Sequence, residues 1–281
     1  MGESLFLNGV DLSTLVRNVE SLAALLRTPP RRGSNLLVPG RHGQLSRADR
    51  PFDAGELVLP MWVVGADEVT GESLAGDAAV TAFYSHVDEL VSLLHAPALT
   101  FDHTLPDTSV RRVVAELAGG EPLEFTRQVG SPLFGRVDVP ISLPDAFWFE
   151  PTTTSTGALT FTSGQERTLA EFAGATAPMA DLDIVFGQGN NPELHQVGTD
   201  GFVAYDGVIG PGQTLTIHCD DTHPTPLEGT GGLVPDYTKL RYLPPRWFEL
   251  DPTAGLDVAL VHTGGGSMSC TVSGNRKFLT G

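Results

Sequence analysis

The chain has 281 residues, and its 34 acidic side chains outnumber 17 basic ones to give a formal net charge of −17. This length fits one large or two ordinary domains with substantial hydrophobic cores. The acidic balance argues against a protein that grips nucleic acid, because phosphate contacts require a basic surface. Two cysteines are too few for a disulfide framework or for a zinc site with four cysteine ligands.

Membrane insertion and secretion are not expected. No apolar run reaches the roughly 20 residues that a membrane helix needs, and the first residues show no signal-peptide pattern. Glycine (32) and proline (21) are abundant and follow no period. Their distribution between apolar runs predicts many turns joining short strands.

A helix is predicted from Asp77 to about Leu94. Asp77 is expected to be its N-cap, and Pro97 prevents its continuation. The apolar stripe consists of Val80, Phe83, Val87, Leu90, Val91 and Leu94. This helix is expected to be structural and to pack on a sheet.

The segment from Leu12 to Leu26 has two interpretations. Its apolar residues follow helical spacing, and Pro29 and Pro30 end the pattern. Short strands are the alternative, since periodicity alone does not decide between them in a segment of this length.

Most of the remaining chain is predicted to form strands. Apolar residues alternate from Leu57 to Val63, before a turn at Gly65, and again from Val137 to Leu143, the pattern of half-buried strands. The polar segment Pro151–Gly157 is typical of an exposed extended linker. We therefore expect two domains: a mixed α+β domain over residues 1–151 and an all-β domain over residues 152–281.

The second domain is predicted to be an antiparallel sandwich, because short apolar runs alternate with turn residues and no helical pattern follows. A turn at Gly207–Gln213 is expected to lead into a strand that places Leu215, Ile217 and Cys219 on one face. The other runs are Leu159–Phe161, Leu182–Phe186, Phe202–Tyr205 and Val258–Val261.

No catalytic residue, metal ligand or cofactor site is predicted. The cluster His218–His223 holds metal-ligand residue types, but its spacing matches no standard zinc site, and a strand that ends in an acidic turn explains it better. The glycine runs lack the context of phosphate loops, and no Gly-x-Ser-x-Gly elbow is present. Enzyme activity is therefore not expected.

One basic stretch stands out in this acidic chain. It contains Arg31, Arg32, Arg41, Arg47 and Arg50. Anion binding and a salt-bridged interface with an acidic neighbouring subunit both fit this stretch.

The chain resembles the distal tail proteins of siphoviruses, in particular the minor tail proteins of actinobacterial phages. The resemblance depends on the order of several weak motifs across nearly the whole chain. These are Phe6–Leu12, Pro29–Gly33, Val38–Gly43, the predicted helix, Leu143–Trp148 and Ile209–Ile217.

The resemblance implies a mainly β (α+β) fold: an N-terminal split barrel with one helix, which forms a ring, and a C-terminal galectin-like β-sandwich. It makes Leu12–Leu26 largely extended. It implies a structural virion protein at the distal end of a long non-contractile tail. A hexameric ring would join the tail tube to the tail tip or baseplate and surround the DNA channel.

The implied partners are further copies of the chain, the tail tube protein, the tape measure protein and the tail-tip or baseplate hub proteins. DNA would pass through the ring without specific binding, because an acidic lining repels it. The residues assigned to the subunit interface are Arg31, Arg32, Pro39, Gly40, Arg41, His42 and Gly43.

A galectin-like sandwich also implies an alternative function, carbohydrate binding for host recognition. Sugar sites stack an aromatic ring on the apolar face of the sugar and orient its hydroxyls with polar groups. The candidate residues are Tyr237, Tyr242 and Trp247. The competing interpretation is that Trp247 and Phe248 fill the core of the sandwich.

Overall fold

The computed structural model describes residues 3–30, 36–37, 44–45, 53–118, 123–128, 133–219, 225–242 and 247–281. The chain divides into two compact units. Unit 1 comprises Met1–Phe149 together with Leu279–Gly281, and unit 2 comprises Glu150–Phe278. The last three residues of the chain therefore belong to unit 1, so unit 2 is inserted between two parts of unit 1.

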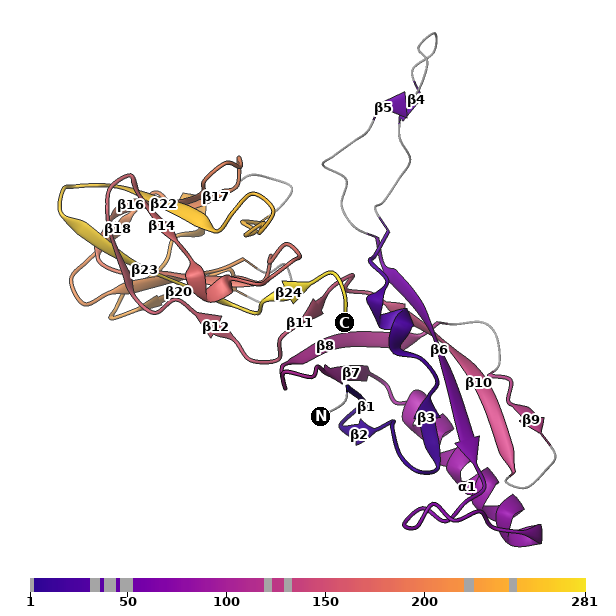
Figure 1. Ribbon diagram of the computed structural model, residues 1–281. Helices are drawn as coiled ribbons and strands as arrows, with labels where there is room; N and C mark the ends of the chain where they lie inside the picture. The colour runs from indigo at the N-terminus through magenta and orange to yellow at the C-terminus, as the bar shows by residue number, and fades with distance from the viewer. Residues whose placement is uncertain are drawn as a thin grey trace. The chain divides into compact units, whose positions relative to one another are not determined.

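Unit 1 contains a curled antiparallel sheet that forms a half-barrel, with the strand order β2-β1-β7-β8-β10-β6-β3 (Figure 1). Strand β11 also pairs with β8, β9 pairs with β10, and β4 and β5 form a separate two-stranded pair. The strands are β1 (Ser4–Leu7), β2 (Val10–Asp11), β3 (Arg17–Val19), β4 (Leu36–Leu37), β5 (Gln44–Leu45), β6 (Gly55–Val64), β7 (Leu99–Thr104), β8 (Val110–Leu117), β9 (Thr126–Gln128), β10 (Phe134–Leu143) and β11 (Trp148–Phe149). The two strands predicted from alternation are confirmed as β6 and β10, the longest strands of the described chain.

The predicted helix is confirmed as α1 (Gly76–Leu94), which packs against β6. Two contacts fix it: the His86 ring nitrogen Nδ1 lies 2.9 Å from the Val64 carbonyl oxygen, and the Phe83 ring lies over Gly135 of β10. A Cβ at Gly135 would lie 2.6 Å from Phe83 Cζ, so this close approach requires glycine.

The details of the helix differ from the prediction in two ways. Asp77 lies in the first turn, and the N-cap position belongs to Ala75, which makes no side-chain capping bond. The buried stripe is Ala79, Phe83, His86, Leu90 and Leu94, whereas the predicted Val80, Val87 and Val91 are only half-buried. Packing against a curled sheet rotates the buried face by part of a turn.

Among the described residues, no helix combines the length and the apolar composition that a membrane span requires.

The ambiguous segment Leu12–Leu26 forms no α-helix. Its first half is extended, as the resemblance implied, because β3 pairs with β6 along Arg17–Val19. Its second half is a 3-10 helix, η1 (Leu22–Leu26), in which Ser21 accepts a hydrogen bond from the N–H of Ala23 at 3.2 Å. Strand pairing overrides the helical spacing of the leucines.

Unit 2 is a β-sandwich of two antiparallel sheets, with the strand orders β12-β23-β15-β19-β20 and β14-β22-β16-β17-β21. Strand β13 also pairs with β23, and β18 with β16. The strands of the two sheets are β12 (Thr154–Ser155), β13 (Leu159–Thr162), β14 (Gln165–Thr168), β15 (Leu182–Phe186), β16 (Gly189–Gln196), β17 (Phe202–Tyr205), β18 (Val208–Ile209), β19 (Thr214–His218), β20 (Leu227–Thr230), β21 (Leu240–Tyr242), β22 (Asp257–Thr263) and β23 (Ser267–Gly274). The unit also contains the short strand β24 (Lys277–Phe278), which belongs to neither sheet, and the 3-10 helices η2 (Ala170–Phe172) and η3 (Tyr237–Lys239).

The predicted strands of this unit are present, and Leu215, Ile217 and Cys219 are buried together. One prediction is wrong: Pro151–Gly157 is not simply a linker, because β12 pairs with β23 through Thr154 and Ser155. The prediction failed because β12 lies at the edge of a sheet and carries hydroxyl side chains, so its composition is that of a linker. The core between the sheets is closed by Phe161, Phe172, Phe186 and Phe248, each at most 1% exposed.

Candidate functional site

Strands β6 and β10 bury one face and present the other outward. We define the outer face as the side chains of these two strands that point away from the core. These are Glu56, Val58, Pro60, Trp62, Val64, Phe134, Arg136, Asp138, Pro140 and Ser142. Most of them are apolar, whereas a sheet with one solvated face normally carries polar side chains there.

Aromatic and aliphatic side chains pair across the outer face. Val64 lies opposite Phe134 in the register of the two strands, and Val58 lies opposite Pro140. The rings of Trp62 and Phe134 are 6.3 Å apart between centroids. Val58 is 45% exposed. The pairs between them are mixed, since Pro60 lies opposite Asp138 and Trp62 lies opposite Arg136. Exposed apolar side chains on a sheet face are typical of surfaces that contact another protein.

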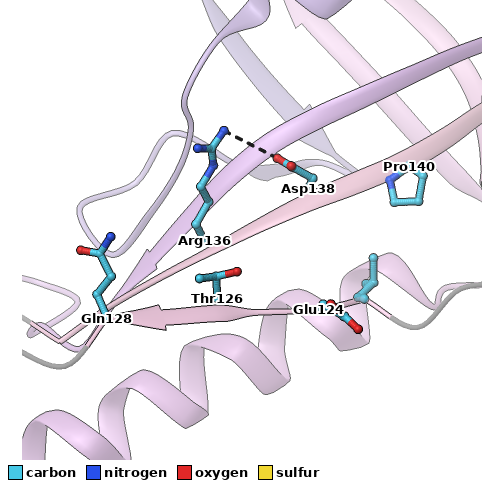
Figure 2. A pocket seen from close by; sticks show the side chains of 7 residues that line it. Glu124, Thr126, Gln128, Arg136, Asp138 and Pro140 are labelled. Atoms are coloured by element: carbon cyan, nitrogen blue, oxygen red, sulfur yellow. Dashed lines mark ion pairs between the residues drawn. The ribbon is translucent and has the colours of Figure 1, made fainter.

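A groove of about 830 Å³ lies beside this apolar surface, where β9 meets β10 (Figure 2). Arg136 and Asp138 from β10 line it together with Thr126 and Gln128 from β9. The Arg136 guanidinium lies 3.1 Å from Glu20 Oε2 and 3.8 Å from Asp138 Oδ1. Arg136 and Asp138 belong to the outer face itself, and apolar side chains mixed with charged, hydrogen-bonding ones are common at protein–protein interfaces.

The sequence-predicted interface lies elsewhere in the chain. Arg31, Arg32, Pro39, Gly40, Arg41, His42 and Gly43 are outside the described residues. Sequence reasoning missed the outer face because it followed only one set of alternating positions. The signal was present, since Leu57–Val64 is continuously apolar, and continuous runs indicate strands covered on both faces.

The predicted sugar-contact residues lie on one edge of the sandwich. Tyr242 ends the edge strand β21, and its ring stacks on Trp247 with centroids 4.3 Å apart and planes 18° apart. Trp247 also packs against the core of unit 2, where Phe248 is 1% exposed. Tyr237 is 52% exposed in η3. The stack uses one face of each ring, and sugar contact by these residues stays a prediction.

The His218–His223 cluster is described only at His218 and Cys219. His218 is 8% exposed, and its Nδ1 lies 2.6 Å from Asp183 Oδ1 on the neighbouring strand. Burial raises the pKa of the Cys219 thiol, which disfavours the thiolate that a metal requires. Within the described ranges, no group of three histidine, cysteine or acidic side chains is placed to hold a metal ion.

Comparison with known proteins gives one informative result. No family model matches the sequence, and no curated protein matches it. A solved structure does match, described as the "Crystal Structure of SPP1 Dit (gp 19.1) Protein, a Paradigm of Hub Adsorption Apparatus in Gram-positive Infecting Phages". The TM-score is 0.61 over 99% of this chain and 100% of that chain, with 15% sequence identity. The two chains share a fold. The expected mainly β architecture with one helix is thereby confirmed.

Proposed function

We propose that this protein is a structural component of a phage tail, a hub at the distal end of a long non-contractile tail. The observation that carries this proposal is the structural match, which runs through both units and covers the whole of a protein described as a hub adsorption apparatus. Agreement over two units in the same order is more specific than a shared sandwich or a shared half-barrel alone.

In this proposal unit 1 closes a homo-oligomeric ring, with six copies around the DNA channel. The outer face of β6 and β10 supplies the apolar centre of the contact between neighbouring copies, and the groove beside it supplies the polar rim. Arg31, Arg32 and Pro39–Gly43, which lie outside the described residues, are proposed as further contacts, because arginines complement an acidic neighbouring copy.

The charge of the chain supports a channel that DNA traverses. A ring of copies at −17 each surrounds the opening with negative charge, which keeps phosphates from adhering. The tail tube, the tape measure protein and the tip proteins are the proposed neighbours. The role is structural and requires no catalytic residue.

The test is the mass and shape of the purified protein, measured by light scattering after size exclusion and by negative-stain imaging. We expect rings with an open centre and six times the 29.8 kDa mass of one chain. A monomer at every concentration tested contradicts a ring that this chain closes by itself.

A matched pair of variants locates the interface. Val58 on the outer face and Val114 on β8 are 45% and 44% exposed. Val58→Glu places a charge in the proposed contact and is expected to give monomers that unfold at the wild-type temperature, whereas Val114→Glu is expected to keep the ring. If the two variants have the same oligomeric state, the outer face is not part of the interface. Substitutions in Pro39–Gly43 test the loop in the same way.

Carbohydrate binding for host recognition is the alternative function. The observations that favour it are the exposed ring of Tyr237 in η3 and the stack of Tyr242 on Trp247 at the edge strand β21. A glycan-binding screen with wild type and Tyr237→Ala tests it. Binding that the substitution abolishes would support the alternative.

A further inference from the structure

An open pocket of about 510 Å³ lies in unit 1, between α1 and the turn that joins β6 to this helix. We call it the acidic pocket and define it by Asp67, Glu68 and Leu74 from the turn and by Ala78, Ala82 and His86 from α1. None of these residues belongs to the outer face of β6 and β10 or lines the groove beside that face. The acidic pocket is therefore a second surface of unit 1, separate from the contact already proposed.

The two carboxylates of the acidic pocket lack a basic partner. Neither Asp67 nor Glu68 forms an ion pair within the described part of the chain. Hydrogen bonds from the backbone and hydroxyl of Thr70 and from the Val69 N–H lower the pKa of Asp67, so this carboxylate stays ionised at neutral pH. All three bonds end on Oδ1, which leaves Oδ2 for another donor. The pocket therefore presents uncompensated negative charge.

His86 adds a hydrogen-bond acceptor to this negative charge. The residue is only 7% exposed, and its Nδ1 lies 2.9 Å from the Val64 carbonyl oxygen. Because a carbonyl only accepts, Nδ1 carries the hydrogen, and Nε2 of the neutral ring is an acceptor. Nε2 has no hydrogen-bond partner within the described residues and is not sealed from solvent, so it opens on the pocket that His86 lines. A nearly buried ring that leaves this acceptor open indicates a donor from outside.

The rest of the wall fits the aliphatic part of a side chain. Leu74, Ala78 and Ala82 supply apolar surface, the hydroxyls of Thr81 and Ser85 are further acceptors, and no lysine or arginine lines the pocket. A guanidinium carries five N–H donors and no acceptor, and in arginine it is attached to an apolar stem. An arginine side chain therefore complements the charge, the acceptors and the apolar wall together.

Exposed apolar side chains on the same turn indicate that the arginine belongs to a protein and is not a free small cation. Val69 is 86% exposed, and Leu15 is 58% exposed. Leu15 packs against the turn, since a Cβ at Gly71 would lie 3.3 Å from Leu15 Cβ. The Val69 N–H donates to Asp67 Oδ1 at 3.0 Å, which fixes the backbone that presents this valine. Apolar side chains next to charged ones are typical of protein contacts.

We propose that the acidic pocket binds an arginine side chain from the basic stretch of a second copy of this chain. That stretch holds five of the 17 basic side chains within 20 residues of an otherwise acidic sequence: Arg31, Arg32, Arg41, Arg47 and Arg50. The inference rests on the proposed function, because a closed ring requires each copy to present two different, complementary surfaces. It assigns the acceptor surface for these arginines, and opposite charges across the contact fix its register.

The test uses a fluorescein-labelled peptide of residues 29–50 and the full chain, at concentrations at which light scattering shows monomers. Fluorescence anisotropy is expected to show saturable binding that weakens as salt is added. A peptide with its five arginines replaced by glutamine is expected not to bind, and one with five lysines to bind more weakly, because a lysine ammonium lacks the planar fork of a guanidinium. Absence of binding overturns the proposal. Equal binding of the lysine peptide overturns the guanidinium assignment.

Three variants of the full chain assign the binding to the pocket. Glu68→Lys reverses a charge there, and Ala82→Leu fills the pocket without changing its charge. Each is expected to weaken binding at least fivefold and to unfold at the wild-type temperature. Glu72→Lys is the control, since Glu72 is exposed on the same turn and does not line the pocket. Binding that both pocket variants leave unchanged, or that Glu72→Lys reduces equally, overturns the site.

The same variants separate this site from the ring. If the wild type forms rings at every concentration, light scattering replaces the peptide assay, and Glu68→Lys and Ala82→Leu are expected to lower the ring fraction whereas Glu72→Lys is not. Rings that survive both pocket variants overturn the pocket and leave the proposed function intact. A wild-type chain that stays monomeric and binds the peptide supports the pocket and contradicts a ring that this chain closes by itself.

Discussion

Gly65 sets the distance between α1 and the end of β6, and replacing it with alanine tests this packing. A Cβ at this position would lie 2.4 Å from the carbonyl oxygen of Ala79 and 3.3 Å from Leu133 Cβ. The φ of Gly65 lies outside the left-handed region, so the cost comes from the contact and not from backbone conformation. The oxygen belongs to the backbone of a helix and cannot rotate away as a side chain does.

Gly65→Ala must therefore push the start of α1 off the sheet. Overpacking of this kind costs about 2–3 kcal/mol, which lowers the unfolding temperature of a unit of this size by roughly 5–10 °C. Hydrogen exchange in Gly76–Leu94 is expected to accelerate, which assigns the loss to unit 1 without reference to unit 2.

Gly55→Ala is the matched control on the same strand. A Cβ there would lie 3.2 Å from Leu143 Cδ1, the end of a side chain that can shift. We expect its unfolding free energy to stay within about 1 kcal/mol of wild type. Equal unfolding temperatures for the Gly65 and Gly55 variants, or unchanged exchange in α1, would refute the close-contact argument.

Three further predictions concern other parts of the chain. Gln196→Ala should cost about 2–4 kcal/mol in urea unfolding, because the buried amide donates to the carbonyls of Asp251 and Gly255 at 2.7 Å each and accepts from the N–H of Asp251 at 2.9 Å; a neutral result would mean that these bonds add nothing. Cys219 and Cys270 should resist iodoacetamide at pH 8 in the folded protein and react after unfolding, since burial raises the pKa of both thiols; mass spectrometry of the native protein would expose the error if label is incorporated rapidly. Asp67 should titrate below 3.8 by carboxyl NMR, because hydrogen bonds from the Thr70 backbone and hydroxyl and from the Val69 N–H lower its pKa. The stability it contributes is therefore complete above pH 3.8 and is lost as the pH falls through the folded value, and Asp67→Asn should remove this dependence.

Local sequence patterns predicted those helices and strands that bury one of their own faces in a core, because this burial produces the spacing of apolar residues. The alternation in Leu57–Val63 and the stripe around Phe83 and Leu90 each follow from one element that packs on one core. The segment Leu12–Leu26 was not determined in this way, because β3 forms by pairing with β6, and the sequence of the segment does not contain its partner. The same limit hid β12, whose polar residues gain their order from β23.

The candidate sites follow the same rule. Nothing near His262 in the sequence indicates the pocket of unit 2 that this residue lines, because Asn190 and Val208 reach the pocket from other segments of the chain. The outer face of β6 could have been predicted from the sequence, since Val58, Pro60 and Trp62 are apolar and alternate with the buried positions of the same strand.

The return of residues 279–281 to unit 1 has a consequence for biosynthesis. The N–H of Gly281 donates to the Leu25 carbonyl at 2.9 Å, and Arg111 donates to the carbonyl of Thr280, 169 residues away in the sequence. Gly281 also packs against the buried indole of Trp148. A growing polypeptide acquires these contacts only after the ribosome has translated all of unit 2. The half-barrel is therefore completed by residues that are translated after unit 2, and a chain that stops within unit 2 leaves the Trp148 indole without the contact from Gly281.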